Sequence, residues 1–412
     1  MAPPVVHTPR HAGARRGGGA AARFPLYVRV VVAPNVSTGA AMRGHRPTTL
    51  FLCGDVMTGR GVDQVLPHAS HPRLYEPAAT SALDYVALAE RAHGPIPRPA
   101  DPGYPWGDAL PVLDRIRPDA RIINLETSVT TSEDAEPKGI NYRMHPGNVP
   151  VLTAAGIDCC VLSNNHVLDW GVAGLVETLD ALAGAGIRVA GAGRDARSAA
   201  SPAVLAGPGG VRVLVYGLGS VDSGIPETWA AGAGRPGVHL LPAFSDEAVG
   251  HVVRLVAATK RPGDVAVASI HWGGNWGYEI PEEHRRFAHA LIEHAGIDVV
   301  HGHSSHHPKA IEVFRDRPVF YGCGDFLNDY EGIPGYDEFR GDLVLMYFPR
   351  LEAGTGRLVR LEMVPLRIRR FRLEILPPED REWLRRTLDR ECRRFGHRVV
   401  ARERDGGWTL EW

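Results

Sequence analysis

Three short segments of this 412-residue chain share one pattern, and this pattern constrains the fold more than any other feature. They are Ala155-Gly156-Ile157, Ala185-Gly186-Ile187 and Ala295-Gly296-Ile297. In each segment the glycine fits the left-handed C-cap of a helix, and the isoleucine begins an apolar run that is typical of a buried strand. Helices that lead directly into strands, again and again, predict an α/β fold.

Apolar runs predict the strands of this fold at residues 50–53, 121–125, 157–162, 187–190, 211–218, 265–270, 297–300 and 319–321. After about residue 340 the sequence pattern changes. Apolar and polar residues alternate in residues 342–348, 358–364 and 366–376, as is typical of antiparallel strands. A helix to about Phe395 and a hairpin of residues 399–401 and 408–412 follow. We therefore predict a main domain over residues 47–350 and a C-terminal strand, helix and hairpin extension over residues 351–412.

Residues 1–46 are rich in Gly, Ala, Arg and Pro, a composition that predicts disorder. Met42 directly precedes the first strand, so it is an alternative start of translation to Met1. No apolar run is long enough for a transmembrane anchor, although Arg15-Arg16 leaves an export signal as an alternative. The five cysteines lack CxxC spacing, which favours reduced core residues of a cytoplasmic protein. The net charge of −1 gives no field that would attract nucleic acid.

Polar residues gather where the predicted strands end. They are Asp55; Asn124 and Glu126; Asn164, Asn165 and His166; His271; and His301, His303 and His306. Because the carboxyl ends of parallel strands share one edge of a sheet, we expect these side chains to converge. A mixture of carboxylate, amide and imidazole suits Mn, Fe or Zn better than Mg or Ca. The sequence thus predicts one or two divalent transition metal ions; a pair would lie about 3.5–4 Å apart, with a bridging hydroxide as nucleophile.

Each of these residues, taken alone, is more often a helix cap or a satisfied polar group than a ligand. The histidine-rich stretch 301–307 is likewise compatible with a polar loop. The prediction therefore depends on the joint pattern.

Further motifs surround these residues: Gly54-Asp55-Val56-Met57-Thr58-Gly59-Arg60, Asn124-Leu125-Glu126, Asn141-Tyr142-Arg143, Ala154-Ala155-Gly156-Ile157-Asp158, Asn164-Asn165-His166-Val167-Leu168-Asp169-Trp170-Gly171 and Gly322-Cys323-Gly324-Asp325-Phe326. In this order, over roughly residues 48–330, they resemble the CapA-type family of capsule-synthesis or poly-γ-glutamate biosynthesis proteins. That family in turn resembles the calcineurin-like metallophosphoesterases. The resemblance implies a metallophosphoesterase-like α/β/β/α sandwich, here with a small C-terminal β/α extension.

The resemblance also implies a role for each matching position. The metal ligands would be Asp55, Glu126, Asn165, His271, His303 and His306, where Glu126 replaces the usual bridging aspartate and His306 stands one residue late. The catalytic residues would be Asn165 and His166, with His166 as the general acid. Two departures, the longer last motif and Met57 where the superfamily has a histidine, put phosphoesterase activity in doubt more than metal binding.

Other side chains are predicted to support the site. Hydrogen bonds from Asn124, His301, Asp169 and Asp325 would orient the ligands, with helix capping as the alternative for Asp325. Arg60 and Arg143 could bind a phosphate or carboxylate, and Trp276 could form a wall of the substrate site. Surface ion pairs and core packing are the alternatives for these three residues.

Two further patterns carry less weight. Residues 191–196 match a dinucleotide-binding fingerprint, but no acidic residue stands near position 213 to bind a ribose, so a glycine turn explains them. Residues 367–404 are rich in arginine, yet their mixed charge favours an exposed helix over nucleic-acid binding.

Two hypotheses of function follow. The first is a metal-dependent hydrolase that cleaves a phosphoester or amide-like bond in an anionic small-molecule, peptide or polymer substrate, such as a γ-glutamyl compound. The second is a non-hydrolytic accessory or assembly protein for polymer synthesis. The sequence leaves the oligomeric state open.

Overall fold

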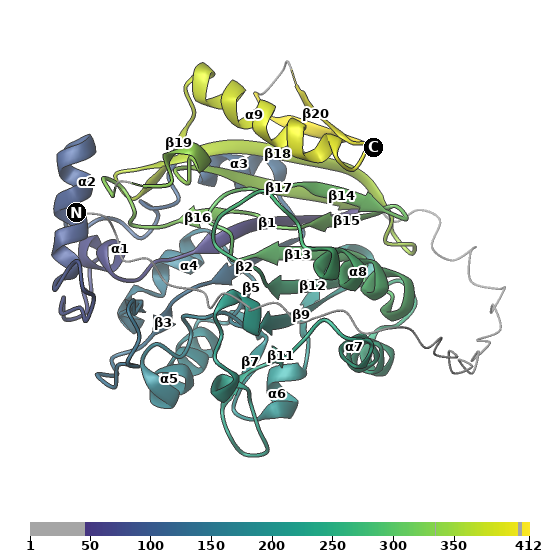
Figure 1. The fold of residues 1–412 in the computed structure, drawn as a ribbon, viewed down its shortest axis with the longest axis horizontal. Coiled ribbons are helices and arrows are strands. Elements are labelled where there is room, and N and C mark those ends of the chain that lie inside the picture. The colour runs from purple at the N-terminus through teal and green to yellow at the C-terminus, as the bar shows by residue number, and fades with distance from the viewer. Residues whose placement is uncertain (1–45, 334, 403–405) are drawn as a thin grey trace, which may run out of the picture.

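The structure is a computed structural model that describes residues 46–333, 335–402 and 406–412. The predicted disordered segment up to residue 45 and the alternative start at Met42 lie outside the described residues. The described chain has an α/β fold with two large sheets and helices around them (Figure 1). This confirms the predicted α/β class.

The first large sheet has ten strands and joins the two ends of the described chain. Across the sheet they are β20 (Arg398–Ala401), β21 (Trp408–Glu411), β18 (Leu358–Arg369), β17 (Leu343–Leu351), β1 (Thr48–Val56), β2 (Ala120–Leu125), β5 (Cys159–Val161) and β6 (Arg188–Ala190), while β16 (Asp325–Leu327) pairs with β1 and β19 (Arg372–Ile375) with β18. Strands β1, β2, β5 and β6 are parallel, and β17 pairs with β1 in the antiparallel sense. The predicted boundary at residues 350/351 falls inside β17, so the two predicted parts share one sheet.

The second large sheet has seven strands. They are β11 (Leu240–Leu241), β9 (Arg212–Ser220), β12 (Val265–His271), β13 (Val299–His303), β15 (Arg317–Phe320) and β14 (Ile311–Phe314), with β8 (Ala203–Ala206) paired to β9. Strands β9, β12, β13 and β15 are parallel. Two smaller pairs complete the described strands: β3 (Ser128–Val129) with β4 (Arg143–Met144), and β7 (Ala192–Gly193) with β10 (Gly237–Val238).

Both faces of the second sheet are buried, in two different cores. In β12 the side chains of Val265 and Val267 join the core shared with the first sheet, whereas Ala266, Ala268 and Ile270 join a second core. This division follows from the period of two in a strand, where neighbouring side chains point to opposite faces. The runs are therefore almost continuously apolar, as expected for parallel strands covered on both sides.

Helices cover the sheets. They are α1 (Gly61–Val65), α2 (Ala82–His93), α3 (Ala109–Ile116), α4 (Pro150–Ala154), α5 (Gly171–Gly184), α6 (Ala196–Ala200), α7 (Asp246–Thr259), α8 (Glu282–Ala290) and α9 (Pro378–Arg393). Helices α7 and α8 supply Val252, Val256 and Phe287 to the second core and lie beside β9 and β12 in Figure 1. None of the helices in the described part of the chain combines the length and the apolar character needed to cross a bilayer.

The local predictions hold at the helix ends and fail in one strand. Gly156, Gly186 and Gly296 have φ angles of 60°, 74° and 70°, which are the predicted left-handed caps. The separate strands expected at residues 358–364 and 366–376 are wrong, because β18 runs through Pro365 to Arg369 and turns back only at Arg370 and Phe371. Pro365 is tolerated because it lies between the segments of β18 that pair with β21 and β19.

Candidate metal centre

Three of the predicted ligands meet where strands of both sheets end. Asp55 lies near the end of β1, His271 ends β12 and His303 ends β13. His271 and His303 are neighbours in the parallel register, and one ligand atom of each of the three residues lies within 4.8 Å of the others. All three side chains are buried. The sheet edge therefore gathers a carboxylate and two imidazoles in one place.

A glycine brings Asp55 to this position. A Cβ atom on Gly54 would lie 1.6 Å from the Gly324 carbonyl oxygen, so only glycine allows β1 and β16 to approach this closely. The N–H of Asp55 donates to that carbonyl at 2.9 Å, and Asp325 becomes the register partner of Asp55. The Gly-Asp pairs of both motifs thus place two carboxylates side by side.

A chain of hydrogen bonds fixes the protons of His303. The Cys53 carbonyl accepts from Nε2–H of His301 at 2.7 Å, so Nδ1 of His301 carries a lone pair and accepts from the Ser269 hydroxyl at 3.0 Å. The same hydroxyl oxygen accepts from Nε2–H of His303 at 3.0 Å. Because burial, with His271 and His301 nearby, lowers the pKa of His303, that ring is neutral and its Nδ1 is left with a lone pair.

His271 has the same arrangement on the other side of the cluster. Its Nε2–H donates to Oδ1 of Asn165 at 3.1 Å, and burial lowers the pKa of the ring, so its Nδ1 also carries a lone pair. The two Nδ1 atoms of His271 and His303 face each other at 2.8 Å, with Oδ1 of Asp55 3.9 Å from that of His303. Two lone pairs at this distance repel each other unless a cation lies between them. Two nitrogens bound to one transition metal at about 2.0–2.1 Å, with a right angle between the bonds, lie about 2.9 Å apart, so the donors fit a divalent cation with octahedral geometry.

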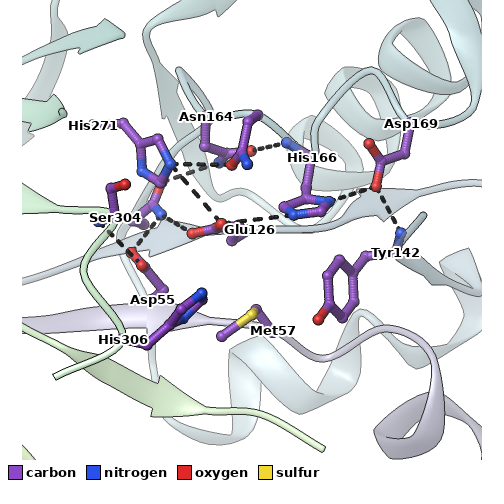
Figure 2. Close-up of polar contacts among 12 residues, drawn as sticks. Asp55, Met57, Glu126, Tyr142, Asn164, His166, Asp169, His271, Ser304 and His306 are labelled. Carbon is purple, nitrogen blue, oxygen red and sulfur yellow. Dashed lines mark hydrogen bonds and ion pairs between the residues drawn. The ribbon is translucent and has the colours of Figure 1, made fainter. Parts of the chain in front are cut away.

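Amide groups hold the neighbouring carboxylates. The Asn124 amide donates to Asp55 Oδ1 at 2.8 Å and to Glu126 Oε2 at 3.0 Å, and Asn164 in turn donates to Asn124 Oδ1 at 3.0 Å. The other oxygen of Glu126 lies 3.9 Å from Nε2 of His271 and 4.0 Å from Nε2 of His166 (Figure 2). Glu126 therefore lies between His271 and His166, with its Oε1 facing both imidazoles.

His166 is held by a buried aspartate. Its Nδ1–H donates to Oδ2 of Asp169 at 2.7 Å, and the same oxygen accepts from the Tyr142 N–H at 2.6 Å (Figure 2). The ammonium of Lys138 lies 2.7 Å from Oδ1 of Asp169 and also donates to the Asn165 carbonyl. Burial outweighs the effect of Asp169 and lowers the pKa of His166 to about 4, so Nε2 presents a lone pair toward Glu126.

His306 completes the group on the side of Asp325. Its Nδ1 lies 2.9 Å from Oδ1 of Asp325, whose Oδ2 accepts from Asn328 at 2.7 Å. Burial alone would lower the pKa of His306, but Asp325 and Asp55 outweigh it and raise the pKa. His306 is therefore the imidazole of this site that most readily carries a positive charge.

The charges of the site favour cation binding. Burial, and then Asp325, raise the pKa of Asp55 to about 7, and burial with Asp55 raises the pKa of Glu126 well above its usual range. Both carboxylates are therefore costly to ionise beside each other. A divalent cation removes this cost, because it favours the ionised carboxylates and the neutral imidazoles that the hydrogen bonds have prepared.

The chain matches the model of a protein family described as bacterial capsule synthesis protein PGA_cap over residues 49–330. The chain belongs to this family. The predicted resemblance to CapA-type proteins is confirmed, and every candidate ligand lies inside the matched PGA_cap region. Strand β17 and the segments after it lie outside that region.

Named relatives agree with this assignment. The chain is similar to a probable polyglutamine synthesis accessory protein of Mycobacterium tuberculosis, with 51% identity over 357 residues that cover 86% of this chain and 93% of the relative. It is also similar to the PGA biosynthesis protein CapA of Bacillus subtilis, with 27% identity over 76% of this chain and 70% of the relative. The capsule biosynthesis protein CapA of Bacillus anthracis is 26% identical over 56% of this chain and 53% of its own length.

The predicted substrate-binding arginines do not join the cluster. Arg60 is 3% exposed and donates to both Asp329 and Glu76. Arg143 is 5% exposed, donates to the Ser132 carbonyl at 2.7 Å and lies over the Trp170 ring. Both guanidinium groups are held in contacts within the fold, and we do not propose them as substrate-binding groups.

Trp276 and Met57 lie at the border of the cluster. The Trp276 ring lies 5.2 Å from that of His306 and is partly exposed, so it stays a candidate for substrate contact. Met57 is buried close to Asp55 and His306 (Figure 2), and its sulfur lies 3.5 Å from the Tyr330 hydroxyl. A thioether is a poor ligand for Mn or Zn, so Met57 supplies no metal ligand of the kind that the superfamily has at this position.

Two residues of the site were absent from the sequence prediction. Ser269 stands two residues before His271 in the same strand, so the period of a strand could have placed both on one face. Lys138 gave no such signal, because it lies in a loop far from Asp169 in the sequence. Only the fold brings the Lys138 ammonium to Asp169.

Proposed function

We propose that this chain is a metal-dependent hydrolase that acts in the synthesis or processing of a polyglutamate-type polymer. The observation that carries the proposal is the pair of Nδ1 atoms of His271 and His303, which face each other at 2.8 Å beside Asp55. The polymer is inferred from the names of the relatives, which are polyglutamine synthesis accessory protein and PGA biosynthesis protein CapA.

The same proposal extends to the fold and its parts. We infer that the two large sheets and their helices are a variant of the metallophosphoesterase α/β/β/α sandwich. The site-bearing unit would span residues 47–350, and residues 351–412 would extend its first sheet. Support comes from the second sheet, which packs on the first sheet on one side and on α7 and α8 on the other.

A bound Mn, Fe or Zn ion would activate water and polarise the bond to be cleaved. The candidate ligands are Asp55, His271 and His303, with Glu126, Asn165 and His306 beside them as ligands of the same ion or of a second ion. Ser269, His301 and Asn124 keep these side chains oriented, and Asp325 does so for His306.

His166 would move the proton. Its Nδ1–H is held by Asp169, so Nε2 is the atom that faces the cluster. Because its pKa is lowered to about 4, His166 enters the reaction neutral, and it would first accept the proton that the attacking water loses. It then returns this proton to the leaving group as the general acid. Lys138 donates to Asp169 and so helps to hold the carboxylate that fixes His166 in this tautomer.

Hydrolysis by the metal-loaded protein tests the proposal. The substrates would be bis(p-nitrophenyl) phosphate for phosphoesters and a γ-glutamyl anilide for amide-like bonds. We expect His166→Ala to lower kcat about 10²- to 10⁴-fold, because a positioned acid–base group contributes that much. His251→Ala, a histidine of α7 far from the ligands in the sequence, is the matched control and should keep its activity. Activity that is absent with both substrates, or equal in His166→Ala and the native protein, would refute the proposal.

A non-hydrolytic accessory role is the second candidate. The name of the mycobacterial relative, an accessory protein, favours this role. Met57 favours it as well, because it stands where calcineurin-like metallophosphoesterases have a metal-binding histidine. Replacing the native gene by the His166→Ala form separates the two candidates in the cell. Normal polymer production with the variant supports the accessory role, whereas lost production supports the hydrolase.

A further inference from the structure

A second candidate binding site lies between α9 and the short turn Asp337–Phe339. There the structure has a cavity of about 550 Å³. Trp383, Thr387 and Arg390 line one side, and their spacing along α9 puts them on one face of the helix. Nearly all of the lining belongs to residues beyond the PGA_cap match, and the volume is in the range of small-molecule sites.

The charged groups around this cavity are only partly used by the protein. Arg390 contacts Glu391 through Nε at 2.7 Å, and its guanidinium lies 5.1 Å from the centre of the Tyr278 ring. Arg390 also donates a hydrogen bond to the Tyr278 side chain, and its guanidinium has more N–H donors than these two contacts use, so the remaining ones can bind a carboxylate. Asp337 and Glu338 are exposed and have no ion-pair partner among the residues that the structure describes. By contrast, Arg340 is already bound by Asp342 and Asp380.

We propose that this cavity binds the zwitterionic end of a γ-linked glutamyl chain. Arg390 would bind the carboxylate, and Asp337 with Glu338 would bind the ammonium. The rings of Tyr278, Phe339 and Trp383 would pack against the methylene groups. One cation and two anions on aromatic walls match a ligand that carries both charges better than they match a simple anion. The choice of a glutamyl chain rests on the proposed function.

The position of the cavity relative to the metal centre supports a chain as the ligand. The Phe339 ring lines the cavity and lies 5.5 Å from the Trp276 ring, which in turn lies 5.2 Å from His306. A row of aromatic rings thus leads from the cavity to the predicted ligands. The Trp276 ring is also stacked on Tyr336 at 4.3 Å, so a chain with its end in the cavity would pass beside these packed rings and bring a later bond toward the metal centre.

Binding to the full-length, metal-free protein tests this inference. The probes are γ-glutamylglutamate, its N-acetylated form and free glutamate. Isothermal titration calorimetry measures the affinity of each probe. We expect Arg390→Met and the double variant Asp337→Asn/Glu338→Gln each to weaken binding of γ-glutamylglutamate at least about tenfold. N-acetylation should weaken it as well. Arg386→Met is the matched control, since Arg386 is on the same helix, is 75% exposed and has Glu382 as its ion-pair partner among the described residues.

Native affinity in Arg390→Met would overturn the inference, and so would equal losses in Arg390→Met and Arg386→Met. Tighter binding of γ-glutamylglutamate than of glutamate supports a chain end, and equal binding overturns that assignment. His303→Ala should bind the dipeptide as the native protein does. Arg390→Met should still hydrolyse bis(p-nitrophenyl) phosphate. Failure of the hydrolase proposal would therefore leave the dipeptide result unchanged, and the two can be told apart.

Discussion

Two pairs of histidines in this protein face each other at almost the same distance. In the metal centre, Nδ1 of His271 lies 2.8 Å from Nδ1 of His303. Where the residue before β11 meets α7, Nε2 of His239 lies 2.9 Å from Nε2 of His251. His239 donates its Nδ1–H to the Gly217 carbonyl, so its Nε2 accepts a proton from His251. His251 is partly exposed, and its other nitrogen can meet solvent. One shared proton satisfies this second pair.

The two pairs differ in the hydrogen bonds of the ring nitrogens that point away from the partner ring, and not in the distance between the rings. In the His271–His303 pair, the N–H group of each ring is Nε2–H, which points away from the other ring and donates to Ser269 or Asn165. The two Nδ1 atoms that face each other therefore have no proton between them. A carboxylate, Asp55, stands beside that gap, whereas the His239–His251 pair has no carboxylate among its described hydrogen-bond partners. A metal site is therefore recognised by the hydrogen bonds behind the ligands.

The largest expected effect is the loss of the metal. We expect the native protein to retain about one or two transition metal ions per chain and His303→Ala to retain almost none, because one of three clustered donors is removed. The measurement is metal content by plasma mass spectrometry after exhaustive dialysis. His251→Ala is the matched control and should keep the native content. Equal losses in both variants would contradict the distinction between the two pairs.

A smaller effect is expected when only the hydrogen bonds that link His301, Ser269 and His303 are removed. Ser269→Ala leaves every ligand in place but frees His301 and His303 to change tautomer. We expect the metal affinity to fall about 10- to 100-fold, as for other residues that orient ligands. Competition with a fluorescent chelator measures this change. Ser223→Ala, which removes a buried hydroxyl bonded to the Ser220 carbonyl, is the control for lost stability alone. An unchanged affinity in Ser269→Ala would show that the tautomer argument is wrong.

The smallest effect concerns the His239–His251 pair and acid stability. Burial and then His251 lower the pKa of His239 to about 4, below the value of about 6.5 in an unfolded chain. The folded state therefore binds fewer protons, so its stability is complete above about pH 6.5 and is lost as the pH falls toward 4. His239→Asn keeps a donor for Gly217 but cannot titrate.

Urea unfolding at pH 7 and pH 5.5 measures this contribution. The free energy of unfolding should fall by about 1.2 kcal/mol less in His239→Asn than in the native protein between these two pH values. If the free energy of unfolding fell equally in His239→Asn and the native protein, the His239–His251 pair would not resist protonation in the folded state.

Much of the fold could be predicted because its signals are local. Glycine caps and apolar runs depend on a few neighbouring residues, and the structure places the caps at Gly156, Gly186 and Gly296 as expected. Which strands become neighbours is not a local property. Strand β17 pairs with β1 although almost the whole chain separates them, and no pattern in residues 343–351 indicates this partner.

The candidate site divides in the same way. The convergence of Asp55, His271 and His303 follows from their places at strand ends, and the structure brings them together. The ion pair that holds Arg60 inside the fold could not be predicted, because its partner Asp329 is 269 residues away in the sequence. Lys138 was missed for the same reason, since it meets Asp169 only through the fold.

Anomalous X-ray diffraction from crystals of the purified protein, measured at the absorption edges of Mn, Fe and Zn, tests the central claim most directly. We predict a transition-metal peak about 2.0–2.2 Å from Nδ1 of both His271 and His303, with Asp55 in the same coordination shell and no peak between His239 and His251. A short hydrogen bond between His271 and His303, with no anomalous peak in crystals soaked in each metal, would contradict the claim.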